Sequence, residues 1–112
     1  MLKLYRVAIT IKSSVKNLED KEWLMNLCRE IAKISGFNIL SEGFSRFEKQ
    51  GATAFLVLSQ SHLSIHTWPE YEIAYIDILS NKEISNKELK KIEAYLNVKV
   101  VVKFVKTETE EL

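Results

Sequence analysis

The order of strand-like and helix-like runs along the chain constrains the fold more than any other feature of the sequence. Runs rich in β-branched and aromatic residues are typical of strands, and here they come in consecutive series with only two helical patterns. The sequence therefore predicts an α+β fold of order βαββββαβ, a two-layer sandwich with two helices on one face of a mainly antiparallel sheet. The predicted strands span residues 2–11, 37–47, 53–59, 71–79 and 98–105, with one further strand that enters a turn at Trp68-Pro69.

Residues that start and stop helices mark the two helical patterns. The first pattern extends from about residue 18 to 35, with Asn17 as its candidate N-cap and Gly36 placed to end it. The second pattern follows Ser85, which is expected to form a capping box with Glu88. Both helices are therefore expected to have defined ends.

Size, charge and cysteine content narrow the kinds of protein that fit. A chain of 112 residues is expected to form one domain, 1–112, whose partly uncovered apolar surface predicts a homodimer. A net charge of +1 provides no broad positive field for nucleic acid, and no apolar run approaches the roughly twenty residues that span a bilayer. The N-terminus lacks the pattern of a signal peptide. The single cysteine, Cys28, lies on the core-facing stripe of the first helix pattern and cannot form an internal disulfide. A cytoplasmic protein without nucleic-acid or membrane partners is expected.

Residues of rare types crowd into the segment 61–71, SHLSIHTWPEY. It contains both histidines, the only proline and one of the two tryptophans. As a strand entering a turn, it would place the even-numbered residues from His62 to His66 on one face and the odd-numbered residues from Leu63 to Thr67 on the other. Two histidines four residues apart could also suggest a metal, but no third histidine completes a shell, so no metal site is predicted.

A hydrolase is a further alternative for this segment. A Ser-His-acid set could be assembled from Ser61, His66 and either Asp77 or Glu70. None of the serines, however, lies in the Gly-x-Ser-x-Gly turn that exposes such a nucleophile. The hydrolase reading is therefore weaker than that of a plain strand.

The same segment resembles the signature of a known family. The run from Ser61 to Tyr71, continued by Ala74 and Ile76-Asp77, is similar to that of the prokaryotic S-adenosylmethionine decarboxylases, which process themselves and depend on a pyruvoyl group. The hairpin before that family's processing site is matched, more weakly, by Phe44, Arg46, Phe47, Gly51 and Thr53.

The resemblance implies that the chain cuts its own backbone between Gln60 and Ser61. The Ser61 hydroxyl would attack the preceding carbonyl, and elimination would leave a pyruvoyl group in place of the serine. A neighbouring His66 would move the protons in this step, aided by the Thr53 hydroxyl. A strained peptide at the cut would favour the reaction.

The resemblance also implies a cofactor, a substrate and its contacts. The pyruvoyl group would form a Schiff base with the amine of S-adenosylmethionine and act as an electron sink when carbon dioxide leaves. The product would be the aminopropyl donor of polyamine synthesis, including that of spermidine. Substrate binding would involve Phe47 stacked on the purine, Glu70 on the ribose hydroxyls, and Leu63.

Besides Glu72-Ile73, where the family tends to have glycine and an aromatic residue, two departures from the family pattern leave the activity open. Asn81 stands where the family has a cysteine that donates the final proton, and a carboxamide cannot donate one at neutral pH. The expected catalytic set is Ser61, His66 and Asn81, with the proton supplied by Ser80, His66 or water. Gln60 stands where the family usually has glutamate.

These departures keep two other functions in view. A remodelled pocket could serve a pyruvoyl-dependent decarboxylase of arginine or ornithine. The chain could instead be a regulatory or nucleoside-binding paralogue without catalysis, an alternative that the substitutions at Gln60 and Asn81 motivate.

Overall fold

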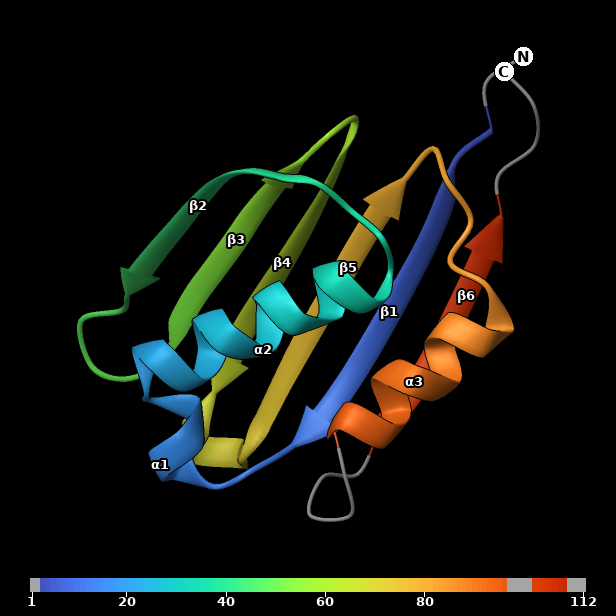
Figure 1. The fold of residues 1–112 in the computed structure, drawn as a ribbon. Coiled ribbons are helices and arrows are strands. Elements are labelled where there is room, and N and C mark those ends of the chain that lie inside the picture. Colours follow the sequence, from blue (N-terminus) through green and yellow to red (C-terminus); the bar gives the residue numbers. More distant parts are fainter. Residues whose placement is uncertain (1–2, 97–101, 109–112) are drawn as a thin grey trace.

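The computed structural model describes residues 3–96 and 102–108, and their helices and strands follow the predicted order with two short additions (Figure 1). These additions are the helical turn α1 and the 3₁₀ turn η1. The elements are β1 (Tyr5–Lys12), α1 (Val15–Leu18), α2 (Lys21–Ile34), β2 (Ile39–Arg46), β3 (Ala52–Leu58), β4 (Ser61–Trp68), η1 (Pro69–Tyr71), β5 (Ile73–Ser80), α3 (Asn86–Leu96) and β6 (Val102–Glu108).

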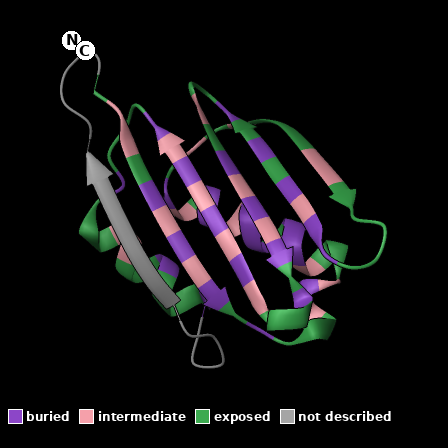
Figure 2. Cartoon of the chain, turned by 180° about the vertical axis from the view of Figure 1, so that it is seen from behind, coloured by how far each residue is buried: buried purple, intermediate pink, exposed green. Residues whose placement is uncertain are grey.

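The strands form one six-stranded antiparallel sheet in the order β2-β3-β4-β5-β1-β6. Helices α2 and α3 lie side by side on one face, as Figure 1 shows, and in Figure 2 the sheet lies in front of them. The predicted α+β sandwich with helices on one face is therefore confirmed. We call the opposite face, which the described helices leave uncovered, the open face. It carries the odd-numbered residues of β3 from Thr53 to Val57 and the even-numbered residues of β4 from His62 to Trp68.

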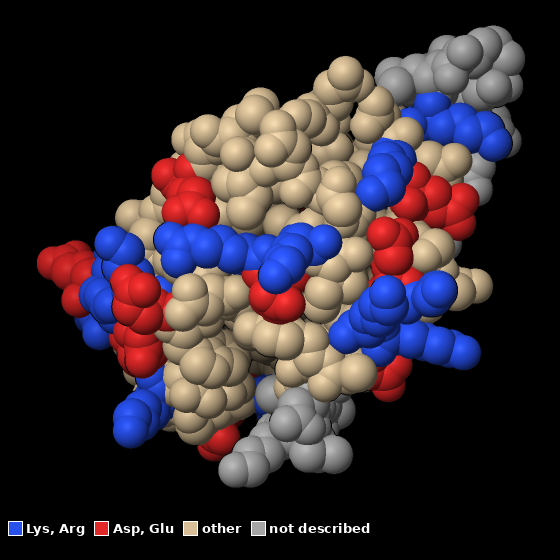
Figure 3. Space-filling model, viewed as in Figure 1, with Lys and Arg blue, Asp and Glu red and all other residues tan. Residues whose placement is uncertain are grey.

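Alternation along the strands builds the core between the sheet and α2. In β4, Leu63 and Ile65 are fully buried beneath the helices, while His62 and His66 point to the open face. Helix α2 contributes a buried stripe at helical spacing that includes the buried Cys28, as its position predicted. Acidic and basic side chains are mixed over the helix-bearing face (Figure 3). In the part of the chain that the structure describes, no helix is long and apolar enough to cross a membrane.

The helix ends confirm most of the predicted caps and correct one. Asn17 does not cap the long helix: the Asp20 side chain accepts a hydrogen bond from the Trp23 N–H at 3.1 Å, and α2 begins at Lys21. Residues 15–18 form the separate turn α1, which occupies the stretch where the longer helix was expected to begin. Gly36 ends α2 with a φ of 73°, as predicted.

In the second half of the chain, the elements follow the predicted order, but two strands have different boundaries from those predicted. The Ser85–Glu88 capping box is confirmed, with its two hydrogen bonds at 2.9 and 3.1 Å. Strand β5 begins at Ile73 rather than residue 71 because the chain first makes the turn η1. The last strand, expected over 98–105, is found at 102–108, and residues 97–101 lie outside the described part.

Candidate functional site

The β3–β4 hairpin sets the backbone around Ser61. Leu58 pairs with Ser61, which leaves Ser59 and Gln60 as a two-residue loop. Gln60 has a φ of 57°, a left-handed conformation that costs a residue with a Cβ roughly 1 to 2 kcal/mol. The peptide link between Gln60 and Ser61 therefore follows a strained residue at the tip of a tight turn.

Two cross-strand pairs hold the two residues of this link. The Ser61 Oγ lies 3.1 Å from the Ser80 Oγ at the end of β5. The Asn81 side-chain amide donates a hydrogen bond to the Gln60 Oε1 at 2.5 Å. The structure therefore brings together Gln60, Ser61 and Asn81, and it adds Ser80 to the group.

The open face carries the second group of predicted residues. Thr53 of β3 pairs in register with His66 of β4, and the Thr53 Oγ1 lies 2.8 Å from the His66 Nδ1. Both side chains are partly buried. This contact fixes the orientation of the imidazole ring and engages one of its two nitrogens.

Asp77 lies on the same face, in contact with two other polar side chains. The Arg6 Nε donates to the Asp77 Oδ1 at 2.8 Å, and the His62 Nε2 lies 3.8 Å from the Asp77 Oδ2. Hydrogen bonding and attraction to Asp77 raise the pKa of Arg6. Asp77 is thus engaged with Arg6 and His62, and the Ser61–His66–Asp77 hydrolase set is not assembled.

The predicted substrate-binding residues occupy three different environments. Phe47 follows β2 and is exposed, and its N–H donates to the Gly51 carbonyl at 2.9 Å. Glu70 in η1 is exposed and accepts a hydrogen bond from the Gln50 side chain at 3.3 Å, which ties η1 to the loop that starts at Phe47. The Leu63 side chain is fully buried in the core. A ligand could therefore reach the side chains of Phe47 and Glu70, but only the backbone of Leu63.

The predicted residues thus form two groups at opposite ends of β4. Ser61 and His66 are five residues apart, which is about 16 Å along a strand at roughly 3.3 Å per residue. Their side chains also point to opposite faces of the sheet. The expectation that His66 neighbours the Gln60–Ser61 link within one chain is therefore wrong, because an odd spacing along a strand separates the two faces.

The chain matches one protein family over almost its whole length. The profile of the S-adenosylmethionine decarboxylase family matches residues 8–109. The chain belongs to this family. Among the S-adenosylmethionine decarboxylase proenzymes, that of Clostridium botulinum strain Langeland is 33% identical over 95 residues, covering 85% of this chain and 78% of the relative. That of Pyrobaculum islandicum is 42% identical over 62 residues, covering 54% of this chain and 50% of the relative.

A solved structure of the same family has the same fold. The crystal structure of the adenosylmethionine decarboxylase from Aquifex aeolicus superposes with a TM-score of 0.72 at 25% identity, covering 97% of this chain and 89% of the other. The sheet with helices on one face is therefore a fold that this chain shares with an S-adenosylmethionine decarboxylase.

Cys28 does not replace the cysteine that S-adenosylmethionine decarboxylases are expected to have at position 81. It lies in α2 with no exposed surface, and burial raises the pKa of its thiol to about 12. A thiol of this kind stays protonated and out of contact with solvent. Cys28 is therefore a residue of the hydrophobic core.

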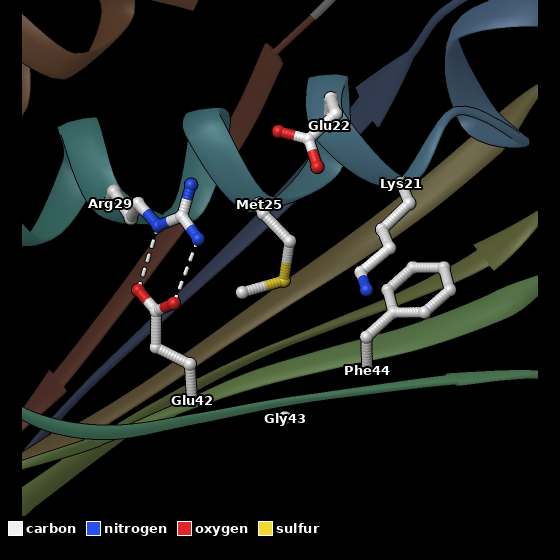
Figure 4. Close-up of a pocket in the computed structure, with 7 residues that line it drawn as sticks. All are labelled: Lys21, Glu22, Met25, Arg29, Glu42, Gly43 and Phe44. Atoms are coloured by element: carbon white, nitrogen blue, oxygen red, sulfur yellow. Dashed lines mark hydrogen bonds and ion pairs between the residues drawn. The ribbon is translucent and has the colours of Figure 1, made fainter.

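A shallow cavity of about 220 Å³ between α2 and β2 lies apart from both groups (Figure 4). Arg29 closes one end by donating to both carboxylate oxygens of Glu42, at 2.7 and 2.8 Å. The hydrogen bond from Arg29 lowers the pKa of Glu42. At the other end, the Lys21 ammonium lies 5.6 Å from the centre of the Phe44 ring. The residues that line the cavity are Lys21, Glu22, Met25, Arg29, Glu42, Gly43 and Phe44, and none of them belongs to the predicted S-adenosylmethionine decarboxylase site.

Sequence reasoning considered Ser80 only as a proton source and missed its contact with Ser61. The signal was available in the register, because antiparallel pairing of His62 with Leu79 places the next residues, Ser61 and Ser80, opposite each other. In this S-adenosylmethionine decarboxylase homologue, Ser80 is therefore part of the surroundings of the link.

Proposed function

We propose that this chain is a pyruvoyl-dependent S-adenosylmethionine decarboxylase that cuts itself between Gln60 and Ser61. The observation that carries the proposal is the hairpin tip, where a serine hydroxyl follows a residue in a strained left-handed conformation. Family membership supports the same assignment. The serine that would become the pyruvoyl group is present and held, so the chain fits the group that the family implies.

The cleavage can be written with the chain's own atoms and one water molecule. The Ser61 Oγ attacks the Gln60 carbonyl carbon, the C–N bond breaks, and the hydroxyl proton moves to the Ser61 nitrogen, which gives an ester. Loss of the Ser61 Cα proton then breaks the Cβ–Oγ bond and releases Gln60 as a carboxylate. Water replaces the nitrogen, which leaves as ammonia, and the second fragment begins with a ketone. Release of backbone strain at Gln60 favours the first step.

His66 would act on this link from a second copy of the chain. Within one chain it is about 16 Å away along β4 and on the other face of the sheet. The open face exposes Phe55, Val57 and Trp68, and an exposed apolar patch of this kind suits a homodimer. Two copies packed with their β4 strands antiparallel would bring the Ser61 end of one to the His66 end of the other, so that His66 would approach the Gln60–Ser61 link from the open face, opposite to the Ser61 side chain. The Nε2 of His66 would move the proton, since Thr53 holds Nδ1.

The same arrangement would complete the substrate site. The pyruvoyl group, once formed, supplies a carbonyl that binds the substrate's amine and accepts electrons as carbon dioxide leaves. Phe47 would stack on the purine and Glu70 would accept hydrogen bonds from the ribose hydroxyls, both from the end of the sheet that holds His66. The product would serve polyamine and spermidine synthesis in the cytoplasm.

Intact mass measurement and mixing of two inactive chains test the proposal together. The purified chain should give two fragments divided before Ser61, the second blocked to N-terminal degradation, whereas Ser61→Ala should stay whole. His66→Ala alone should also stay whole. Refolding it together with Ser61→Ala, which retains His66, should restore cleavage of the His66→Ala chain. A native chain that stays whole would refute self-cleavage, and the absence of rescue would refute action between copies.

A paralogue without catalysis is the second candidate, and the amide pair at the link favours it. Gln60 and Asn81 hydrogen-bond to each other where the family is expected to have two ionisable groups. Carbon dioxide release from the cleaved protein, measured with S-adenosylmethionine, arginine and ornithine, separates the candidates. Release from S-adenosylmethionine that increases with Asn81→Cys would support the decarboxylase. Cleavage without release from any of the three would support the paralogue.

A further inference from the structure

Ser80 makes a side-chain contact with the hydroxyl that would cut the chain. It is the last residue of β5, it is a buried residue (2% exposed) on the helix-covered side, and its Oγ lies 3.1 Å from the Ser61 Oγ. A buried hydroxyl in contact with a nucleophile restricts the directions in which that nucleophile can point.

A second contact leaves the Ser80 oxygen able to accept this hydrogen bond. The Lys82 backbone N–H donates to the Ser80 Oγ at 2.8 Å and occupies one of its two lone pairs. The other lone pair can accept the Ser61 proton, which leaves the lone pairs of Ser61 free to attack. Lys82 is itself fixed, because its ammonium donates to the Ser35 carbonyl at the end of α2 and lies 5.1 Å from the Phe37 ring centre.

We infer that Ser80 is a positioning residue for self-cleavage, which rests on the proposed function. The Ser80 hydroxyl accepts a hydrogen bond from the Ser61 hydroxyl. This contact holds the Ser61 Oγ in one orientation before it attacks the Gln60 carbonyl. A neutral hydroxyl is too weak a base to keep that proton, so Ser80 orients the nucleophile and His66 exchanges the proton. A single hydrogen bond of this kind is worth about tenfold in rate.

The test follows cleavage of the freshly translated full-length chain by intact mass. Ser80→Ala should slow cleavage about tenfold, and Ser80→Thr, which keeps the hydroxyl and suits a strand, should restore it. Ser35→Ala is the matched control: Ser35 is also buried, and its Oγ donates to the Ile31 carbonyl at 2.8 Å. It should destabilise the fold to a similar extent, measured by thermal unfolding, yet leave the cleavage rate unchanged.

Hydroxylamine, which captures the ester, separates the first step from the later ones. Ser80→Ala should lower the amount of captured ester, and a purely structural role would not change it. If Ser80→Ala does not fold, Ser80→Cys, whose thiol is a weaker hydrogen-bonding group, should cleave more slowly than Ser80→Thr. Cleavage of the alanine variant at the native rate would overturn the inference and leave the proposed function standing. A native chain that never cleaves would remove both.

Discussion

Gly51 occupies a backbone position that a larger residue cannot take without strain. Its φ is 96°, and a Cβ placed there would lie 2.8 Å from the Thr67 carbonyl oxygen. Gly51→Ala is therefore expected to destabilise the protein by about 2 to 3 kcal/mol, measured by urea unfolding. Gly36→Ala is the control: its φ is 73°, but its Cβ would meet only the end of the Lys82 side chain, which can shift more easily than backbone, so its cost should be nearer 1 kcal/mol. Equal costs would contradict this account.

Cys28 gives the protein a stability that falls at alkaline pH. Burial favours the protonated thiol and raises its folded-state pKa to about 12, while an exposed thiol in the unfolded chain titrates near about 8.5. The contribution of this group is complete below the unfolded pKa and is lost as pH rises from there towards about 12, by at most about 1.4 kcal/mol per pH unit. Urea unfolding between about pH 8 and about pH 10 should show a shallower decline for Cys28→Ala than for the native chain. Parallel declines would rule out this source.

The sequence singled out candidate site residues but not the contacts between them. Ser61 and His66 stand out because rare residue types crowd around them. The two side chains lie on opposite faces of the sheet because the residues are an odd number of positions apart on one strand. This follows from the spacing only when the segment is known to be a strand. Ser80 could be placed against Ser61 only once the β4–β5 register was known, because strand pairing is non-local.

At the scale of elements, two residues, Asp20 and Asn17, are candidates for capping the start of α2. Asp20→Ala should cost about 1 kcal/mol, because the Asp20 carboxylate accepts the Trp23 N–H at the first turn of a long helix. Asn17→Ala should cost about half as much, since its side chain donates only to the Ser13 hydroxyl at 3.1 Å. Thermal unfolding followed by circular dichroism ranks the two variants. The opposite order would restore Asn17 as the more important cap.

Element types were predictable from local patterns, and element ends were less so. The mostly polar stretch 12–17 and Asp20 offer several residues that can cap a helix, so periodicity alone could not choose among them. The capping box at Ser85 was clear because its partner Glu88 lies three residues away. The pairing of β1 with both β5 and β6 could not be predicted, because it joins segments far apart in the chain.

At the scale of the whole molecule, the open face is the proposed dimer interface, and one charge should disrupt it. Val57 lies on this face and is 41% exposed, so Val57→Lys would bury an unpaired ammonium between two copies. Sedimentation velocity should show a dimer weakened by at least about tenfold, with the fold intact by circular dichroism. Val15→Lys, at an exposed valine of α1 outside this face, should leave the dimer unchanged. A Val57→Lys chain that dimerises normally would exclude this face.

Strand β1 comes from the first half of the chain but lies between two strands of the second half, β5 and β6. A break before Ser61 would therefore produce two interlaced polypeptides, each contributing inner strands to a single sheet, with β3 still paired to β4 across the cut. Neither piece could leave without breaking three ladders of backbone hydrogen bonds, β3–β4, β1–β5 and β1–β6. The severed molecule would keep the shape of the uncut one, and only a denaturant would part its halves.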